Sequence, residues 1–206
     1  METQDRINHW QNIYKTKHLN EVSWYQPTPS ISLKLIANLN LSKSAKIIDI
    51  GGGDSFLVDY LLELGYTNIS VLDISEEAIL RAKSRLGSNA SKVTWITSDI
   101  VTFKPTEEYD IWHDRATFHF LTENQDIEKY KELVSSTISN IGNVIIGTFA
   151  IDGPKKCSGI DIKQYSKESL VDIFKNTFLL ENCVNIDHET PFNTIQKFIF
   201  CSFKRL

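Results

Sequence analysis

Short apolar runs alternate with amphipathic stretches along most of the chain. Residues 46–50 contain isoleucines around one acid, which is typical of a short buried strand, and residues 56–64 resume at helical spacing. Helical spacing also marks the segments between the later apolar runs. Further strands are predicted at 69–73, 92–96, 109–113 and 143–149. The alternation predicts an α/β fold in which a mostly parallel sheet carries helices on both faces.

The two ends of the chain depart from this alternation. Ile7, Trp10 and Tyr14 recur at helical spacing and predict an amphipathic N-terminal helix, followed by a second helix at 30–39. At the other end, strands at about 179–187 and 195–203 have no helix between them, so they are expected to pair antiparallel. We therefore predict one domain over residues 1–206, with residues 1–40 as a helical lid.

Composition and charge narrow the class of protein. The chain has 206 residues, 41% of them hydrophobic and 23% charged, with a formal charge of -4. This is typical of a soluble globular protein and favours neither a nucleic-acid partner nor a membrane. Three widely spaced cysteines without a CxxC pair predict reduced thiols in a cytoplasmic protein and no metal site.

Polar residues follow the predicted parallel strands at their carboxyl ends. Asp49, Asp73, Asp99 and Asp114 each close or follow one strand. Ligands of such sheets bind beyond the carboxyl ends of the strands, so these four positions are expected to meet in one crevice. His113 and His119 flank the fourth acid in the sequence.

Three consecutive glycines after Asp49 allow a ligand to lie against bare backbone. Asp73 follows Gly51 by 22 residues (73 minus 51), near the spacing of an acid that binds ribose hydroxyls. Phe56 stands where a dinucleotide-binding turn has its third glycine, and no P-loop is present. The crevice therefore favours a cofactor with one ribose and no phosphate.

These residues resemble the class I S-adenosylmethionine-dependent methyltransferases. The likeness comprises the acid-x-Gly-x-Gly turn at 49–53, the ribose acid Asp73 and the adenine-side acid Asp99, with Ser55 in place of the third glycine of the family. It implies a three-layer Rossmann-like fold with seven strands in the order 3-2-1-4-5-7-6, the last hairpin strand antiparallel, and S-adenosyl-L-methionine as cofactor. The cofactor-binding residues that it implies are Asp49, Gly51, Gly52, Gly53, Asp73, Ile74, Asp99 and Ile100.

The stretch Trp-His-Asp-Arg-Ala at 112–116 is similar to the Trp-Asp-Arg-Gly-Ala stretch of thiopurine S-methyltransferases, with one residue inserted. In that family the arginine borders the substrate pocket, which implies a substrate role for Arg115. The same position resembles an Asp-Lys-Gly stretch of some protein-lysine methyltransferases, which leaves a protein substrate open. Trp24 and Tyr25 either cover the crevice, where aromatic faces attract a sulfonium cation, or pack as a hydrophobic lid.

His113, Asp114 and His119 are the candidate catalytic residues, because an imidazole titrates near neutral pH and can act as a general base. The alternative is that these residues cap a helix and form a surface ion pair. Our leading hypothesis is methyl transfer by in-line displacement to sulfur, nitrogen or oxygen of a small molecule. The alternatives are a protein-lysine methyltransferase, a nicotinamide-dependent oxidoreductase and a non-catalytic S-adenosylmethionine-binding module.

Overall fold

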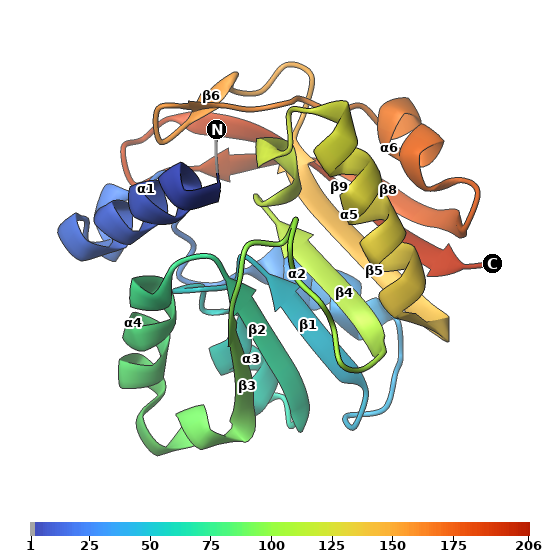
Figure 1. The fold of residues 1–206 in the computed structure, drawn as a ribbon, viewed down its shortest axis with the longest axis horizontal. Coiled ribbons are helices and arrows are strands. Elements are labelled where there is room, and N and C mark those ends of the chain that lie inside the picture. The colour runs from blue at the N-terminus through green and yellow to red at the C-terminus, as the bar shows by residue number, and fades with distance from the viewer. Residues whose placement is uncertain (1–2) are drawn as a thin grey trace.

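A seven-stranded sheet forms the centre of the molecule in a computed structural model that describes residues 3–206 (Figure 1). The strand order is β3-β2-β1-β4-β5-β9-β8; the first five are parallel, and β9 runs antiparallel to both of its neighbours. This confirms the predicted order and the antiparallel hairpin. The strands are β1 (Lys46–Ile50), β2 (Asn68–Asp73), β3 (Val93–Thr97), β4 (Tyr109–Arg115), β5 (Ile138–Phe149), β8 (Phe178–Glu189) and β9 (Ile195–Arg205).

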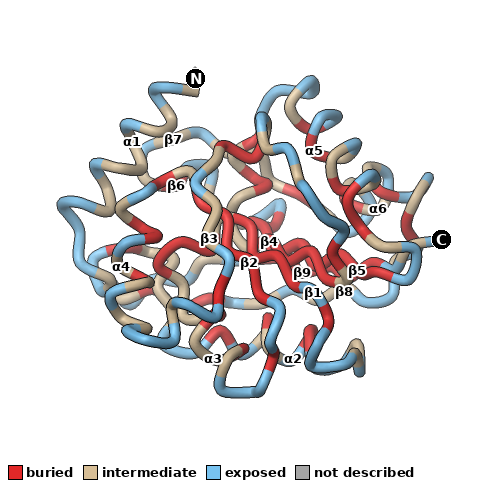
Figure 2. Tube along the Cα trace, turned by 60° about the horizontal axis from the view of Figure 1, so that its bottom comes forward, coloured by how far each residue is buried: buried red, intermediate tan, exposed pale blue. Residues whose placement is uncertain are grey.

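Helices cover both faces of the sheet, and its central strands are buried (Figure 2). Leu35 and Leu61 pack on one face from α2 and α3, while Tyr130 and Phe174 pack on the other from α5 and α6. Among residues 3–206, no helix is long and apolar enough to cross a membrane. The helices are α1 (Thr3–Thr16), α2 (Ser30–Asn38), α3 (Leu57–Glu63), α4 (Glu76–Leu86), α5 (Asn124–Thr137) and α6 (Lys167–Phe174), with 3-10 turns at Leu19–Glu21, Gly87–Lys92 and Phe118–Phe120.

The junction between α5 and β5 differs from the sequence-based prediction. The helix ends at Thr137, and Ile138 already pairs with Tyr109 of β4, so β5 begins five residues earlier than expected. Ile141 lies on this extended segment and is 69% exposed. Pairing with a neighbouring strand overrides helical spacing here.

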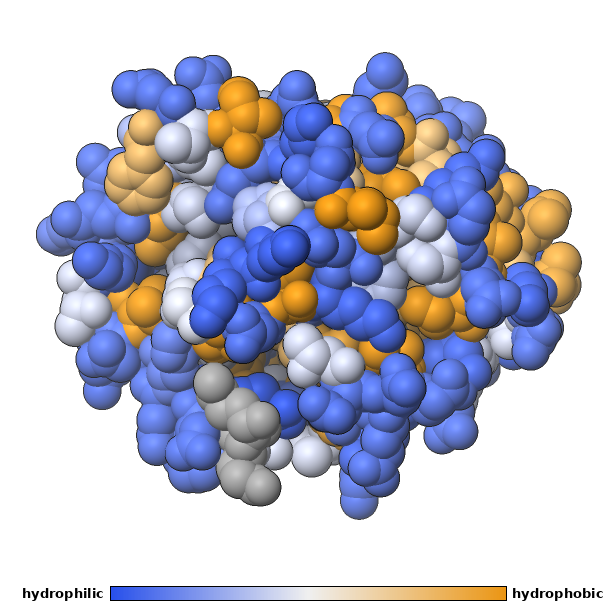
Figure 3. Space-filling model, turned by 90° about the horizontal axis from the view of Figure 1, so that it is seen from above, coloured by the Kyte–Doolittle hydropathy of each residue, from blue (hydrophilic) through white to orange (hydrophobic). Residues whose placement is uncertain are grey.

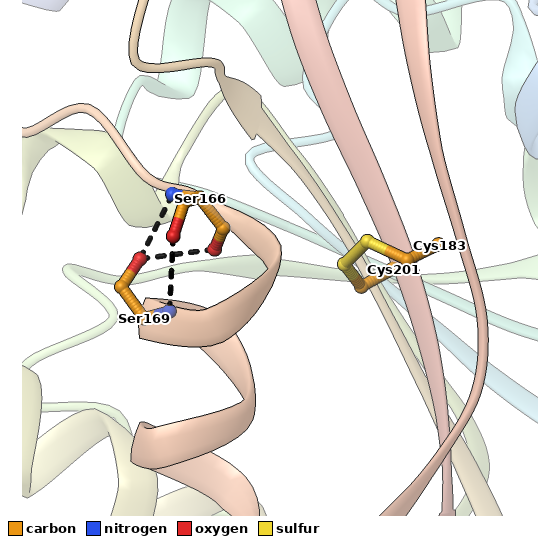
Figure 4. Close-up of a disulfide and its surroundings, with 4 residues drawn as sticks. All are labelled: Ser166, Ser169, Cys183 and Cys201. Atoms are coloured by element: carbon orange, nitrogen blue, oxygen red, sulfur yellow. Dashed lines mark hydrogen bonds between the residues drawn. A yellow bond between two sulfur atoms is a disulfide. The ribbon is translucent and has the colours of Figure 1, made fainter.

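Serine side chains cap two of the helices at their N-termini. Ser75 accepts a hydrogen bond from the backbone N–H of Ala78, and Ser166 forms a reciprocal cap with Ser169 at α6 (Figure 4). By contrast, the N-cap of α5 is Glu123, whose side chain makes no cap hydrogen bond. Neighbouring backbone geometry decides which of several polar residues can reach the free N–H groups.

Cys183 and Cys201 form a disulfide between β8 and β9 (Figure 4). The antiparallel register sets the two residues directly opposite each other, with their Cα atoms 4.1 Å apart. This corrects the expectation of reduced thiols for this pair, because residues 18 positions apart in the sequence become cross-strand neighbours only in the folded hairpin. Cys157 is a free, buried cysteine on the small hairpin of β6 (Lys156–Cys157) and β7 (Ile160–Asp161).

Candidate active site

The glycine turn after β1 lies between three side chains that leave no room for a Cβ. Gly51 has a φ of 65°, and a Cβ there would overlap the hydroxyl of Thr117. A Cβ at Gly53 would overlap Oδ2 of Asp73 and the methyl group of Ala78. The glycines therefore bring the backbone into direct contact with the neighbouring acids.

Asp73 ends β2 and is almost completely buried beside this turn. Its Oδ1 accepts a hydrogen bond of 2.7 Å from the N–H of Ser75, and the N–H of Gly53 also donates to the carboxylate. Burial raises the pKa of Asp73 to about 7, partly offset by these hydrogen bonds. A carboxylate held in this way retains acceptor capacity for further donors.

Asp99 follows β3 and is bound by a side chain from the N-terminal helix. Its Oδ2 lies 2.7 Å from Nη2 of Arg6, and its Oδ1 accepts a hydrogen bond from the N–H of Val101. Ile100 follows Asp99 in the sequence and is buried. The first helix thus reaches the far end of the crevice, 93 residues along the chain.

These groups line one pocket, which opens to solvent. Gly51, Asp73, Ile74, Asp99 and Ile100 form its floor at the carboxyl ends of the parallel strands, as predicted. Its other walls are largely aromatic: Trp10 and Tyr14 from α1, Trp24 from the following loop, and Phe120 beyond β4. Figure 3 shows the molecule from above, on the side where α1 lies, with hydrophobic side chains between hydrophilic ones.

Helix α1 is attached to the rest of the molecule through polar contacts at the first turn of α4 and beyond. Gln11 Oε1 accepts hydrogen bonds from the Ser75 hydroxyl and from the N–H of Glu77. Arg81 of α4 donates to the carbonyl oxygens of Tyr14 and Lys17 at the end of α1. These contacts hold the aromatic side chains of α1 over the pocket.

A buried hydrogen-bonded chain links β1, β4 and α2 beside the glycine turn. Asp49 and His113 are paired in the parallel register, and Asp49 Oδ1 lies 2.6 Å from His113 Nδ1. His113 Nε2 lies 2.8 Å from the hydroxyl of Ser32. Both ring nitrogens are therefore occupied, and one carboxylate oxygen of Asp49 is bound to His113. His113 lines a second pocket with Gly52 and Ser55, next to the first.

Asp114 and His119, two of the candidate catalytic residues, lie outside both of these pocket linings. Asp114 Oδ1 accepts hydrogen bonds from the N–H groups of Thr117 and Phe118, and Oδ2 accepts one from the Tyr130 hydroxyl. This carboxylate therefore closes the turn after β4. The His119 ring is buried against Phe149 with centroids 4.5 Å apart, and burial followed by the charge of Arg115 lowers its pKa to about 3.

Arg115, Trp24 and Tyr25, the residues predicted to contact the substrate, each line at least one of the two pockets. Arg115 is the last residue of β4, which extends two positions beyond the predicted strand, and it lines both pockets. Its Nη1 donates to the carbonyl oxygen of Trp24 at 3.1 Å. Tyr25 lines only the second pocket, where its ring lies 6.2 Å from that of Phe56.

Several pocket residues are absent from the sequence-based site. Arg6, Trp10 and Tyr14 belong to a helix whose spacing indicated packing, and nothing in that spacing indicates what the helix covers. Phe120 and Cys157 also line the pocket. Burial raises the pKa of the Cys157 thiol to about 11, so it remains protonated at neutral pH. The opposite charges of Arg6 and the acids at the strand ends were the signal in the sequence that could have placed α1 at this pocket.

The chain matches known methyltransferases in sequence. Residues 47–137 match the family model described as a methyltransferase domain. The chain is 21% identical over 140 residues to the eEF1A lysine and N-terminal methyltransferase of Bos taurus, covering 68% of this chain and 20% of that protein. It is 27% identical over 107 residues to malonyl-[acyl-carrier protein] O-methyltransferase 2 of Ilyobacter polytropus, covering 52% of this chain and 40% of that protein. The chain thus spans less than half the length of these curated relatives.

Solved structures share the fold of the whole chain. The N-methyltransferase NodS from Bradyrhizobium japonicum, in complex with S-adenosyl-L-homocysteine, has a TM-score of 0.71 at 15% sequence identity, covering 96% of this chain and 98% of that chain. The family match does not support the nicotinamide alternative. Residues 47–137 are thus similar to the methyltransferase domain family, and the whole chain has the fold of a solved methyltransferase that binds S-adenosyl-L-homocysteine, which indicates S-adenosyl-L-methionine as the cofactor.

Proposed function

We propose that this chain transfers a methyl group from S-adenosylmethionine to a sulfur, nitrogen or oxygen atom of a small molecule. The supporting observation is the pocket at the carboxyl ends of the parallel strands, to which α1 and Trp24 contribute aromatic walls. A concave pocket with largely apolar walls and a few polar groups suits a small ligand. The arrangement supports residues 1–40 as a cap on a single domain; residues 1 and 2 lie outside the described part of the chain.

The pocket floor fits the cofactor. The glycine turn presents bare backbone, the Asp73 carboxylate has capacity to accept hydrogen bonds from two ribose hydroxyls, and Asp99 with Ile100 would border the adenine. Asp49 would affect cofactor binding indirectly, through the glycine turn beside it. When bound, S-adenosylmethionine supplies a methyl group already activated by its sulfonium. Trp24 and Tyr25 would lie near the methyl group that is transferred.

We propose that catalysis depends on alignment and exclusion of water rather than on a histidine base. The two nitrogens of His113 are occupied by Asp49 and Ser32, and His119 does not line the pocket. Asp114 is occupied by backbone N–H groups. Positioning a nucleophile in line with an activated methyl group can supply much of the rate enhancement.

A protein-lysine acceptor is the second candidate, because the Bos taurus relative is named as a lysine methyltransferase. The likeness of residues 112–116 to thiopurine S-methyltransferases instead supports a sulfur acceptor, and Arg115 lines the pocket in keeping with that likeness. We retain a small-molecule acceptor as the proposal and the cytoplasm as the proposed compartment.

Transfer of radiolabelled methyl groups separates these acceptors. The purified protein is incubated with methyl-labelled S-adenosylmethionine and either a metabolite extract or a protein extract from the same cells. We expect label in the metabolite fraction, and the Asp73→Ala variant serves as the inactive control. Label confined to proteins would replace our proposal with the second candidate, and label in neither fraction together with intact cofactor binding would indicate a binding module.

A further inference from the structure

Arg115 lines the pocket, and one edge of its guanidinium has no hydrogen-bond partner among residues 3–206. Nη1 donates to the carbonyl oxygen of Trp24, but Nε and Nη2 are buried and have no hydrogen-bond partner among residues 3–206. Within the same residues, no carboxylate lies within ion-pair distance of this guanidinium. Its centre lies 5.0 Å from the centroid of the Phe198 ring. Leaving charged donors buried and unpaired costs stability, so such an edge is expected to serve a ligand.

The titratable groups around Arg115 do not neutralise its charge. Burial lowers the pKa of Arg115 only to about 10, so the guanidinium remains charged at neutral pH. His119 and His188 have lowered pKa values and the Cys157 thiol a raised one, in each case chiefly through burial, which keeps all three neutral. Asp49 attracts Arg115 at longer range, but its Oδ1 already binds His113.

The position of the guanidinium assigns it to the acceptor side of the pocket. The acids expected to bind the cofactor close β2 and follow β3, on one side of β1. Arg115 closes β4 on the other side of β1, and its guanidinium lies over Phe198 of β9, two strands further along the sheet. The free donors are therefore displaced from Asp73 and Asp99 toward the end of the crevice walled by Trp24, Phe120 and Cys157.

We propose that the methyl acceptor is an aromatic or apolar carboxylic acid whose carboxylate pairs with Nε and Nη2 of Arg115. These two nitrogens form one edge of the planar guanidinium, and their parallel N–H groups match the two oxygens of a carboxylate. The aromatic walls accept the rest of the molecule. The same charge disfavours an ammonium group, including a lysine side chain, at this end of the pocket. This inference rests on the proposed function and names the class of its acceptor.

Calorimetric titration of the protein saturated with S-adenosylhomocysteine tests the inference. The probes are benzoate, phenylacetate and indole-3-acetate, each paired with its uncharged primary amide. We expect at least one acid to bind ten-fold or more tightly than its amide. Arg115→Met should abolish this preference, and Arg115→Lys should retain only part of it. Lys155→Met removes an exposed positive charge two residues before Cys157 and should leave the preference for the acid unchanged.

If no acid binds more tightly than its amide, or if Arg115→Met retains the preference, the inference is wrong. A second arm compares S-adenosylhomocysteine with 5′-methylthioadenosine, which lacks the carboxylate. If Arg115→Met weakens the binding of S-adenosylhomocysteine ten-fold but does not weaken that of 5′-methylthioadenosine, Arg115 binds the carboxylate of the cofactor. That result overturns the acceptor assignment but leaves the proposed function standing. Failure of the unmodified protein to bind S-adenosylhomocysteine would instead refute the proposed function. Melting temperatures confirm that each variant is folded.

Discussion

Arg6 Nη2 and Asp99 Oδ2 lie 2.7 Å apart and join the N-terminal helix to the end of β3. The Asp99 side chain is 4% exposed and that of Arg6 18% exposed, so water screens this pair less than a surface ion pair. The pair therefore couples the position of α1 to the acid expected on the adenine side of the cofactor.

Loss of this ion pair should weaken cofactor binding without unfolding the protein. Replacing Arg6 with glutamine removes the charge that holds α1 over the pocket, and we expect the affinity for S-adenosylhomocysteine to fall about five-fold, or about 1 kcal/mol. Lys15→Gln breaks the more exposed pair of α1 with Glu77 and serves as the matched control. Calorimetry measures both variants, and equal affinities for them would contradict the proposed role of Arg6.

Asp73 should make cofactor affinity depend on pH near neutrality. The pKa of Asp73 in the folded protein is about 7, above the ordinary value of 3.8, so the folded state binds more protons than the unfolded chain between these values. The contribution of this group to stability therefore falls as pH rises through that window. Ribose hydroxyls require the ionised acceptor, so affinity for S-adenosylhomocysteine should fall by up to about ten-fold per pH unit below pH 7.

The Asp73→Asn variant provides the control for this pH dependence, because an amide does not titrate in the same range. Its affinity should be low and constant between pH 5.5 and 7.5. Asp73→Ala should lose about 1.5–3 kcal/mol of binding free energy at pH 7.5, the range for a hydrogen bond to a charged group. An unchanged dissociation constant in Asp73→Ala would remove this residue from the site.

A methyl group at Gly53 should disrupt the cofactor site more than the fold. The added Cβ would overlap Asp73 Oδ2 and the Ala78 methyl group, so the carboxylate must shift away from the turn. We expect Gly53→Ala to lower S-adenosylhomocysteine affinity at least ten-fold while the far-ultraviolet circular dichroism spectrum remains unchanged. In the double variant with Asp73→Ala, the second substitution should add little, because both act on the same carboxylate. Additive losses would refute this shared mechanism.

The Cys183–Cys201 disulfide should stabilise the closing hairpin. It closes a loop between residues 18 positions apart, for which constraint of the unfolded chain predicts about 3 kcal/mol. Purified protein with the bond intact should therefore lose about that much free energy of unfolding on reduction, measured by urea denaturation. Cys157→Ser, which leaves the bond in place, should respond to reduction in the same way. Alkylation of cysteines at lysis, read by mass spectrometry, determines whether the bond exists in the cell.

The parts of this protein predicted from its sequence are those that depend on local spacing. The apolar periods along the chain predicted most strands and helices, and the acids at strand ends were placed together because carboxyl ends of parallel strands share one edge of a sheet. Asp73, Asp99 and Gly51 therefore line one pocket, whereas Asp49 lines the second pocket and Asp114 neither. The predicted boundary between helix and strand was wrong where strand pairing outweighed helical spacing, as at Ile138.

Contacts between distant segments were decided only by the tertiary structure. Helical spacing showed that α1 is amphipathic, but the surface it covers depends on how Arg6 and Gln11 meet residues far along the chain. In the same way, the register of β1 with β4 pairs Asp49 with His113, and the hairpin register joins Cys183 to Cys201. A spacing pattern specifies which face of an element is apolar, whereas partners across space are selected by the packing of the whole chain.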